Sequence, residues 1–293
     1  VKAAFALLPE ILRDPLPPEM RQKYALCELR FALENIHFPG SMELLDIARR
    51  RLVFEELLVL QLGLLSLKSR ARVENKLRLT RDDSEGFFRL LPFTPTGAQR
   101  RAVRECLRDM MGDSPMNRLI QGDVGSGKTA VAAALCYCVI QDGMQAALMA
   151  PTEVLARQHH KTLSALLEPA GIHTALLVGS MTPKQKREAV EGLASGEFQL
   201  AVGTHALLTE GVAFRKLGLV ITDEQHRFGV AQRAALAQKG ENPHLLVMSA
   251  TPIPRTLALM IFGDLDISVL DELPPGRQKI ETFAITSDKR QRA

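Results

Sequence analysis

The sequence predicts an α/β protein in which a parallel sheet is covered by helices on both faces and is preceded by a smaller all-α segment. From about residue 87, short apolar runs alternate with helical segments, a pattern typical of parallel sheets. Residues 1 to about 80 instead show helical periodicity and no strand alternation. A chain of 293 residues is long enough for two such parts.

Composition places the chain among ordinary globular proteins. It is 46% hydrophobic and 24% charged. With 37 basic and 33 acidic residues, its net charge is +4, which permits nucleic-acid binding without requiring it. The four cysteines lack metal-ligand spacing, and Cys136 and Cys138 lie in an apolar helical run, so we expect reduced, buried thiols. No apolar run is long enough to span a membrane, and we see no secretion signal.

The leading segment is expected to be helical. The prolines of 14–18 form a rigid connector, and 19–36 then reads as one helix. Ser41 is a good N-cap for the next helix, and the strongly apolar stretch 54–67 predicts a helix buried on several sides. The basic triplet 49–51 is expected to be a solvated helix face, with contact to a phosphate backbone as the alternative.

The second part alternates between strands and helices. The runs expected to be strands are 118–121, 146–150, 174–178, 199–202, 217–222 and 245–249. The helices expected between them include 130–141, 152–167 and 183–194. The last of these has Thr182 as its N-cap and Pro183 at its first position.

A glycine-rich loop separates the first apolar run from the helix that follows it. Its residues Gly122, Asp123, Val124, Gly125, Ser126, Gly127, Lys128 and Thr129 read G-x-x-x-x-G-K-T. Backbone N–H groups of such a loop converge on phosphate oxygens, and the helix adds its positive N-terminal end. We expect Lys128 to reach the outer phosphates and Thr129 to hold a magnesium ion. A chance glycine turn is the alternative, which the strand-loop-helix context disfavours.

Two adjacent carboxylates, Asp223 and Glu224, follow the apolar run 217–222. Ligands bind at the carboxyl ends of the strands in open α/β sheets. Asp223 is therefore expected to hold magnesium, directly or through water, and Glu224 to orient the attacking water. The alternative is a solvated acidic turn, which is less favoured because the glycine-rich loop lies in the same predicted sheet.

Further polar residues follow other predicted strands. Ser249, Thr251 and Arg255 lie in a stretch whose hydroxyls could hydrogen-bond the His226 region and report the nucleotide state. Two other stretches place small or polar residues where sugar-phosphate contacts are expected. These residues are Pro151, Thr152, Arg157, Gly203, Thr204 and His205. Ordinary turns remain the alternative for each stretch.

Taken together, Gln99 and the stretches GDVGSGKT, APTEVLA, GTHALL, DEQH and SATPIPRTLA resemble the first motor domain of superfamily-two helicases. More narrowly, DEQHRFGV, SATPIPRTLALMIFGDLDISVLDELPPGR and the leading DPLPPE…RFALENIHFP…FEELLVLQLGLL resemble the RecG family of bacterial DNA helicases. The resemblance covers essentially the whole chain. The Mfd family of transcription-repair coupling translocases shares GDVG-x-GKT, GTH-x-LL and TATPIPRTL, but resembles the leading segment much less well.

The resemblance implies a RecA-like P-loop NTPase domain that uses ATP and Mg²⁺ to move along branched double-stranded DNA, such as stalled forks and Holliday junctions, in recombination and repair. It implies domains at 1–86 (helical linker), 87–265 (ATP binding) and 266–293 (connector). It also implies a monomer of the bacterial cytoplasm, with single-stranded DNA-binding protein as a candidate partner.

The resemblance also assigns roles to individual residues. Gln99 senses adenine, and Lys128 and Glu224 are catalytic. The residues that couple nucleotide state to motion are His226, Ser249, Thr251 and Arg255. The DNA contacts are Pro151, Thr152, Arg157, Gly203, Thr204 and His205.

Several parts of such helicases are not found in this sequence. We find no second motor domain after about residue 270, no Q-x-x-G-R-x-G-R stretch to supply an arginine finger, and no wedge domain. Both ends are therefore expected to be cuts in a longer protein, and this chain to hold half of an ATPase site. A nucleotide-binding module without turnover remains the alternative for this chain alone.

Overall fold

The structure is a computed structural model, and it describes residues 13–70, 74–223, 235–250, 265–272 and 274. The chain forms two compact units that divide between residues 72 and 73. We call residues 13–70 the helical unit and the described residues from 74 onward the sheet unit, and we treat each by itself. Within these ranges, no helix combines the length and apolar character needed to cross a bilayer.

The helical unit contains three helices, and the first two replace the single helix expected over 19–36. Their bounds are α3 (Pro18–Lys23), α4 (Leu29–His37) and α5 (Met42–Arg70). The break between α3 and α4 contains Ala25, which adopts a φ of +51°. Helix α5 begins after Ser41, whose Oγ accepts from the Leu44 N–H at 3.2 Å, as an N-cap does. The segment 54–67 is part of this 29-residue helix. The expected burial on several sides is wrong, because Leu57, Val59, Leu60 and Leu62 are exposed.

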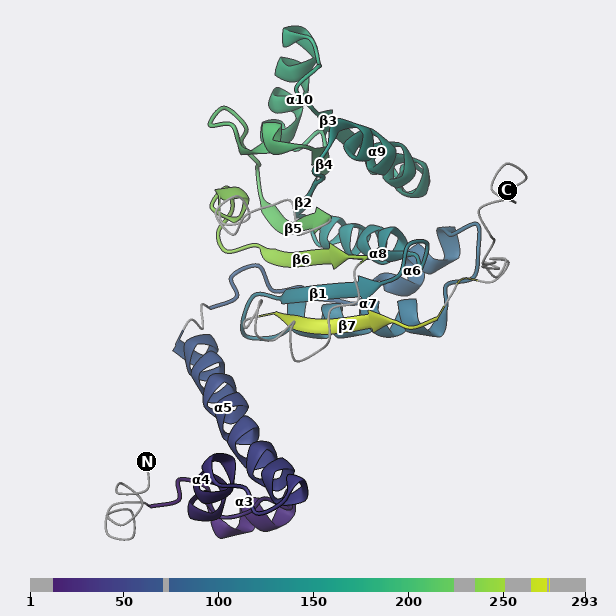
Figure 1. The fold of residues 1–293 in the computed structure, drawn as a ribbon. Helices are drawn as coiled ribbons and strands as arrows, with labels where there is room; N and C mark the ends of the chain where they lie inside the picture. Colours follow the sequence, from purple (N-terminus) through teal and green to yellow (C-terminus); the bar gives the residue numbers. More distant parts are fainter. Residues whose placement is uncertain (1–12, 71–73, 224–234, 251–264, 273, 275–293) are drawn as a thin grey trace, which may run out of the picture. The chain divides into compact units, whose positions relative to one another are not determined.

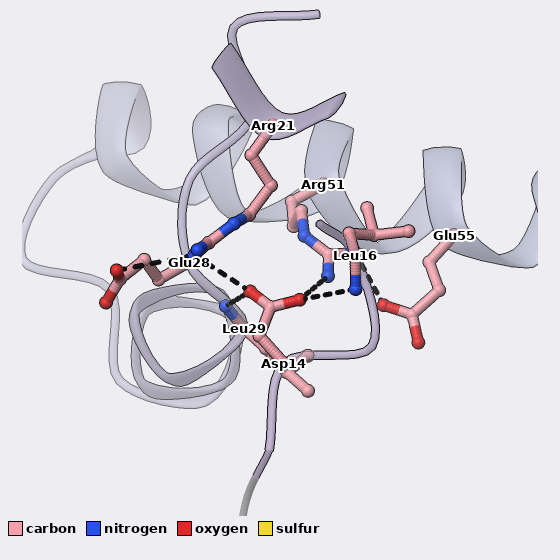
Figure 2. Close-up of polar contacts among 7 residues, drawn as sticks. All are labelled: Asp14, Leu16, Arg21, Glu28, Leu29, Arg51 and Glu55. Carbon is pink, nitrogen blue, oxygen red and sulfur yellow. Dashed lines mark hydrogen bonds and ion pairs between the residues drawn. The ribbon is translucent and has the colours of Figure 1, made fainter. Parts of the chain in front are cut away.

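Asp14 ties the helical unit together (Figure 2). Its Oδ1 accepts from the Leu16 N–H at 3.0 Å, and its Oδ2 accepts from the Leu29 N–H at 2.9 Å. Arg51 Nη2 donates to Oδ1 at 2.7 Å, and Arg21 Nη1 donates to Oδ2 at 3.1 Å. Burial opposes the charged form, but the bonds from Leu16, Leu29 and Arg51 hold the pKa of Asp14 below its ordinary value. One carboxylate thus joins the proline-rich connector to α4 and α5.

Arg51 is the buried member of the basic triplet. Its side chain is 0% exposed and pairs with both Asp14 and Glu55 (Figure 2). The expected solvated face is therefore wrong for Arg51. The Asp14 carboxylate, 37 residues away in the sequence, compensates the desolvation of the buried guanidinium. Arg49 and Arg50 are exposed, as expected.

The sheet unit is built on a parallel sheet with the strand order β3-β4-β2-β5-β6-β1-β7 (Figure 1). The strands are β1 (Asn117–Gly122), β2 (Gln145–Met149), β3 (Thr174–Leu177), β4 (Leu200–Gly203), β5 (Leu217–Asp223), β6 (His244–Ser249) and β7 (Asp266–Leu270). The first six lie where the apolar runs predicted strands. The RecA-like α/β architecture is confirmed.

Helices cover both faces of this sheet. They are α6 (Ser84–Leu90), α7 (Gly97–Met110), α8 (Lys128–Gln141), α9 (Glu153–Leu167) and α10 (Pro183–Ser195), with the short 3-10 turns η1 (Glu168–Ala170) and η2 (His205–Leu208). In β2 and β4, alternate residues enter two different cores. In β2, Ala146 and Leu148 pack in the core that includes α7, α8 and α9, whereas Ala147 and Met149 pack in the core that includes α10.

Two predicted boundaries differ from the structure. The chain joins the sheet unit by residue 74, before the expected boundary at 86, because Leu77 and Leu79 are buried in its core and the Leu79 N–H donates to the Met110 carbonyl at 3.2 Å. The expected connector 266–293 begins with β7, which pairs with β1 at the edge of the sheet.

Candidate functional site

The carboxyl ends of three neighbouring strands bring the main predicted residues to one edge of the sheet (Figure 1). Asp223, the last residue of β5, aligns with Met248 of β6, and Met248 aligns with Ile120 of β1. The glycine-rich loop begins at Gly122, just beyond Ile120. Because neighbouring strands lie about 4.8 Å apart, β5 and β1 are about 10 Å apart. Such an edge is where open α/β sheets bind ligands.

The glycine-rich loop has the conformation that its glycines permit. Gly125 and Gly127 adopt φ values of +81° and +86°, which only glycine takes readily. A Cβ on Gly122 would lie 2.5 Å from Ser126 Oγ, so this position has no room for a side chain. Gly127 is the N-cap of the 14-residue helix α8. The backbone of the loop therefore lies at the positive N-terminal end of α8, as is typical of phosphate sites.

Lys128 folds back over this loop. Its Nζ donates to the Gly122 carbonyl at 2.6 Å and to the Asp123 carbonyl at 2.9 Å. Ser126 Oγ is buried, and among the described residues it has no hydrogen-bond partner. A buried hydroxyl without a partner is costly and calls for a ligand atom or water. An ammonium group and a hydroxyl without a partner among the described residues, in one small loop, fit a phosphate group.

Gln99 braces the same loop from α7. Its Nε2 donates to the Ser126 carbonyl at 2.8 Å, and its Oε1 accepts from the Thr96 N–H at 3.0 Å. Thr96 in turn accepts from the Gln99 N–H, so the two residues form a capping box at the start of α7. A Cβ on Gly127 would lie 2.1 Å from Gln99 Nε2. Each end of the amide makes one of these bonds and can make a second, and the adenine-sensing role remains a prediction.

Asp223 is held by a residue that the sequence analysis did not single out. Nε2 of His159, on α9, lies 2.7 Å from Asp223 Oδ2. His159 belongs to the buried face of α9, together with Ala156, Leu163 and Leu167. A histidine at a core position of an amphipathic helix is a sequence signal for a buried polar partner. The local pattern around His159 does not identify this partner, which is 64 residues away in the sequence.

The expected DNA contacts lie at the carboxyl ends of β2 and β4. These two strands are neighbours, and the Ala150 N–H donates to the Gly203 carbonyl at 2.8 Å. Thr152 caps α9, where its side chain accepts from the Leu155 N–H. Pro151 lies directly before this cap. The structure therefore brings the two predicted stretches together at one edge.

The other members of this edge have distinct surroundings. A Cβ on Gly203 would lie 2.2 Å from the Leu177 carbonyl oxygen, which gives this glycine a packing role. Thr204 is buried, and its Oγ1 has no hydrogen-bond partner among the described residues, whereas His205 is exposed. Arg157 Nη2 donates to Ser180 Oγ at 3.0 Å. Their contacts with DNA remain predictions.

The remaining predicted residues have less structural support. Ser249 ends β6 at the same edge of the sheet and is buried. Glu224, His226, Thr251 and Arg255 lie outside the described residues. Their catalytic and coupling roles therefore stay as the sequence predicts them.

For magnesium, the predicted donors are the Asp223 carboxylate and the Thr129 hydroxyl. The described residues contain no cluster of three or more histidine, cysteine, aspartate or glutamate side chains that could form a protein-only metal site. Magnesium in nucleotide sites is instead held by one or two carboxylates together with substrate phosphates and water. The residues present therefore fit magnesium bound with a nucleotide.

A family model and known proteins match this chain. The DEAD/DEAH box helicase family matches residues 96–260. The ATP-dependent DNA helicase RecG of Synechocystis is 51% identical over 95% of this chain and 34% of its own length. The RecG helicase of Bacillus subtilis is 47% identical over 98% of this chain and 43% of its own length.

A solved structure extends the similarity to the fold. The structure of RecG bound to a three-way DNA junction matches 96% of this chain and 38% of its own, with a TM-score of 0.76 and 41% sequence identity. The chain spans less than half the length of each of these relatives. The chain belongs to the DEAD/DEAH box helicase family and, within that family, to the RecG group.

Proposed function

We propose that this chain is the ATP-binding half of an ATP-driven motor that moves on branched double-stranded DNA. The observation that carries the proposal is the meeting of the glycine-rich loop and Asp223 at one sheet edge, in a chain similar to RecG along nearly its whole length. Lys128 belongs to this loop, as does the Ser126 hydroxyl, which has no hydrogen-bond partner among the described residues, and the N-terminus of α8 favours negative charge there.

Each residue of the site has a separate part in this proposal. When nucleotide binds, Lys128 donates to the outer phosphates in place of the Gly122 and Asp123 carbonyls. Thr129 and Asp223 would hold magnesium. When bound, magnesium neutralises charge that develops on the phosphate oxygens. Glu224 orients and polarises the attacking water. The Gln99 amide keeps the loop in place and contacts adenine.

DNA is proposed to bind along the carboxyl ends of β2 and β4. The support is the meeting of Thr152 and Thr204 at one edge and the similarity to a RecG structure described as bound to a three-way DNA junction. Forks and Holliday junctions are the proposed substrates. The Mfd-type alternative is less favoured, because similarity to RecG helicases extends over 95–98% of the chain and thus includes the helical unit.

The complete motor is proposed to need parts outside this sequence. An arginine finger from a second motor domain is worth about three to five orders of magnitude in related phosphoryl transfer. This chain alone is therefore proposed to bind nucleotide with little turnover. We further propose a monomer that works in the bacterial cytoplasm, with single-stranded DNA-binding protein as a candidate partner.

The test uses the full-length protein that contains this chain, measured for ATP hydrolysis with and without a three-way DNA junction. We expect the junction to stimulate hydrolysis and Glu224→Gln to lower turnover by roughly two or more orders of magnitude, as for loss of a general base. The affinity of the Glu224→Gln variant for Mg-ATP should stay near that of wild type, because the Glu224 charge acts mainly in the transition state. Asp223→Asn should instead weaken nucleotide binding when magnesium is present. Wild-type turnover in Glu224→Gln would remove its catalytic role.

A further inference from the structure

The contact between His159 and Asp223 joins two parts of the sheet unit that are distant in sequence. The His159 ring lies on the buried face of α9, and its Nε2 is 2.7 Å from Asp223 Oδ2 at the end of β5. The two side chains are 10% and 14% exposed, so little water competes for this bond. Because a carboxylate can only accept, the imidazole Nε2 carries the proton and donates it.

We propose that His159 is a positioning residue for Asp223, on which the proposed magnesium site depends. A terminal carboxylate rotates over a broad range of angles unless a neighbour fixes its plane. The bond from His159 supplies that restraint from a rigid helix. Hydrogen-bond partners of metal-binding carboxylates typically contribute 10- to 100-fold to metal affinity. This inference rests on the proposed function, because it assumes that Asp223 serves magnesium.

The position of α9 adds to the significance of this bond. The helix begins at its cap Thr152, a proposed DNA contact, and carries His159 further along the same element. One rigid helix therefore carries both the proposed DNA contact and the group that holds Asp223. A purely structural contact is the competing explanation, since buried hydrogen-bonded pairs also stabilise folds.

A matched pair of substitutions separates these explanations. Glutamine and methionine have side chains of nearly equal length, but only glutamine offers an N–H donor. The experiment measures ADP affinity of this chain by calorimetry, once with magnesium and once with EDTA, for wild type, His159→Gln and His159→Met. His160→Phe is the control on the same helix, because His160 contacts Thr174 instead. Thermal unfolding of each variant without nucleotide is measured alongside.

We expect His159→Met to lose about 10- to 100-fold in affinity for Mg-ADP. With EDTA, its ADP affinity should equal that of wild type, and His159→Gln and His160→Phe should bind Mg-ADP much as wild type does. Equal Mg-ADP affinity in wild type and His159→Met would overturn the inference. So would an equal loss with and without magnesium, or a loss in His159→Gln as large as that in His159→Met.

Two further outcomes are decisive. If wild type shows no magnesium-dependent ADP binding, both the proposed function and the inference are wrong. In the failures described above, by contrast, wild type binds Mg-ADP and only the role of His159 is wrong. If His159→Met does not fold, ¹⁵N NMR of the wild-type imidazole gives the answer. The His159 resonances should shift when Mg-ADP is added and not when ADP is added in EDTA. Unchanged resonances in Mg-ADP would overturn the inference.

Discussion

The side-chain amide of Gln99 joins α7 to the glycine-rich loop. Its Nε2 donates to the Ser126 carbonyl at 2.8 Å, and its Oε1 accepts from the Thr96 N–H at the start of α7. Both bonds are buried. The residue that the sequence associates with adenine is thus also a support for the backbone of the proposed phosphate site.

Gln99→Ala should therefore weaken nucleotide binding and lower the melting temperature of the chain. The substitution leaves the Ser126 carbonyl and the Thr96 N–H without these partners, and an unsatisfied buried group costs about 1–3 kcal/mol. Affinity for GTP should fall by about tenfold, and affinity for ATP should fall further through loss of the adenine contact. Calorimetric titration with both nucleotides measures this. An unchanged GTP affinity would contradict the role of Gln99 in supporting the loop. Equal losses of ATP and GTP affinity would show that Gln99 does not contact adenine.

The Arg51–Asp14 pair predicts a local loss of stability in the helical unit. Arg51→Met removes the buried partner of Asp14 and Glu55 and should destabilise this unit by about 3 kcal/mol, as when one member of a buried ion pair is lost. Amide hydrogen exchange should accelerate in α4 and α5, with little change in β1. Arg50→Met is the matched control, because Arg50 is exposed and should change exchange only slightly. Equal protection in both variants would contradict the account.

His244 predicts that the sheet unit loses stability in mild acid. The Met116 N–H donates to His244 Nδ1 at 2.9 Å, so Nε2 carries the proton and donates to the Leu77 carbonyl at 3.0 Å. Burial lowers the pKa of His244 below its ordinary value of 6.5, although the Leu77 bond and Asp109 oppose this shift. The folded state thus binds fewer protons than the unfolded state. Stability should be complete above pH 6.5 and fall as the pH drops towards the lowered pKa.

Urea unfolding between pH 7.5 and 5 measures this effect. His244 contributes a slope of at most about 1.4 kcal/mol per pH unit. His244→Gln keeps an acceptor and a donor but does not titrate, so it should flatten the slope. His205→Gln, at an exposed position, should leave the slope as in wild type. A slope unchanged by His244→Gln would show that another group is responsible.

The proposed dependence on an arginine finger from a second motor domain predicts slow turnover by this chain. Without an arginine finger, we expect hydrolysis well below about 1 s⁻¹, the low end of typical enzyme rates. Branched DNA should not rescue it. A steady-state phosphate-release assay with and without a three-way junction measures this, and a DNA-stimulated rate above about 1 s⁻¹ would show that the site is complete without the finger.

The elements that the sequence predicted well are those governed by local patterns. Six strands lie at continuous apolar runs, and the caps Ser41 and Thr182 lie where side-chain chemistry predicted them. Strand β7 was missed because Asp266–Leu270 lies at the edge of the described sheet, next to β1, and exposes Asp266 and Val269. Such an edge strand has no continuous apolar signal.

What could not be predicted depends on contacts between distant residues. The break before α4 is stabilised by Asp14, which accepts from the Leu29 N–H and has no local pattern that would reveal it. The glycine-rich loop and Asp223 were recognisable because each motif is contiguous. His159 could not be recognised from the sequence, because its partner Asp223 is 64 residues away and the two meet only in the folded chain.

The central claim is that the loop from Gly122 to Thr129 binds the phosphates of Mg-ATP, and calorimetric titration of this chain with Mg-ADP tests it most directly. Lys128→Ala removes charge-assisted hydrogen bonds to phosphate worth about 1.5–3 kcal/mol, so its affinity should fall by about 10- to 100-fold. Lys184→Ala, on α10 with a side chain that is 79% exposed, is the control and should bind as wild type does. Equal affinity for Mg-ADP in wild type and Lys128→Ala would contradict the assignment of this loop as the nucleotide site.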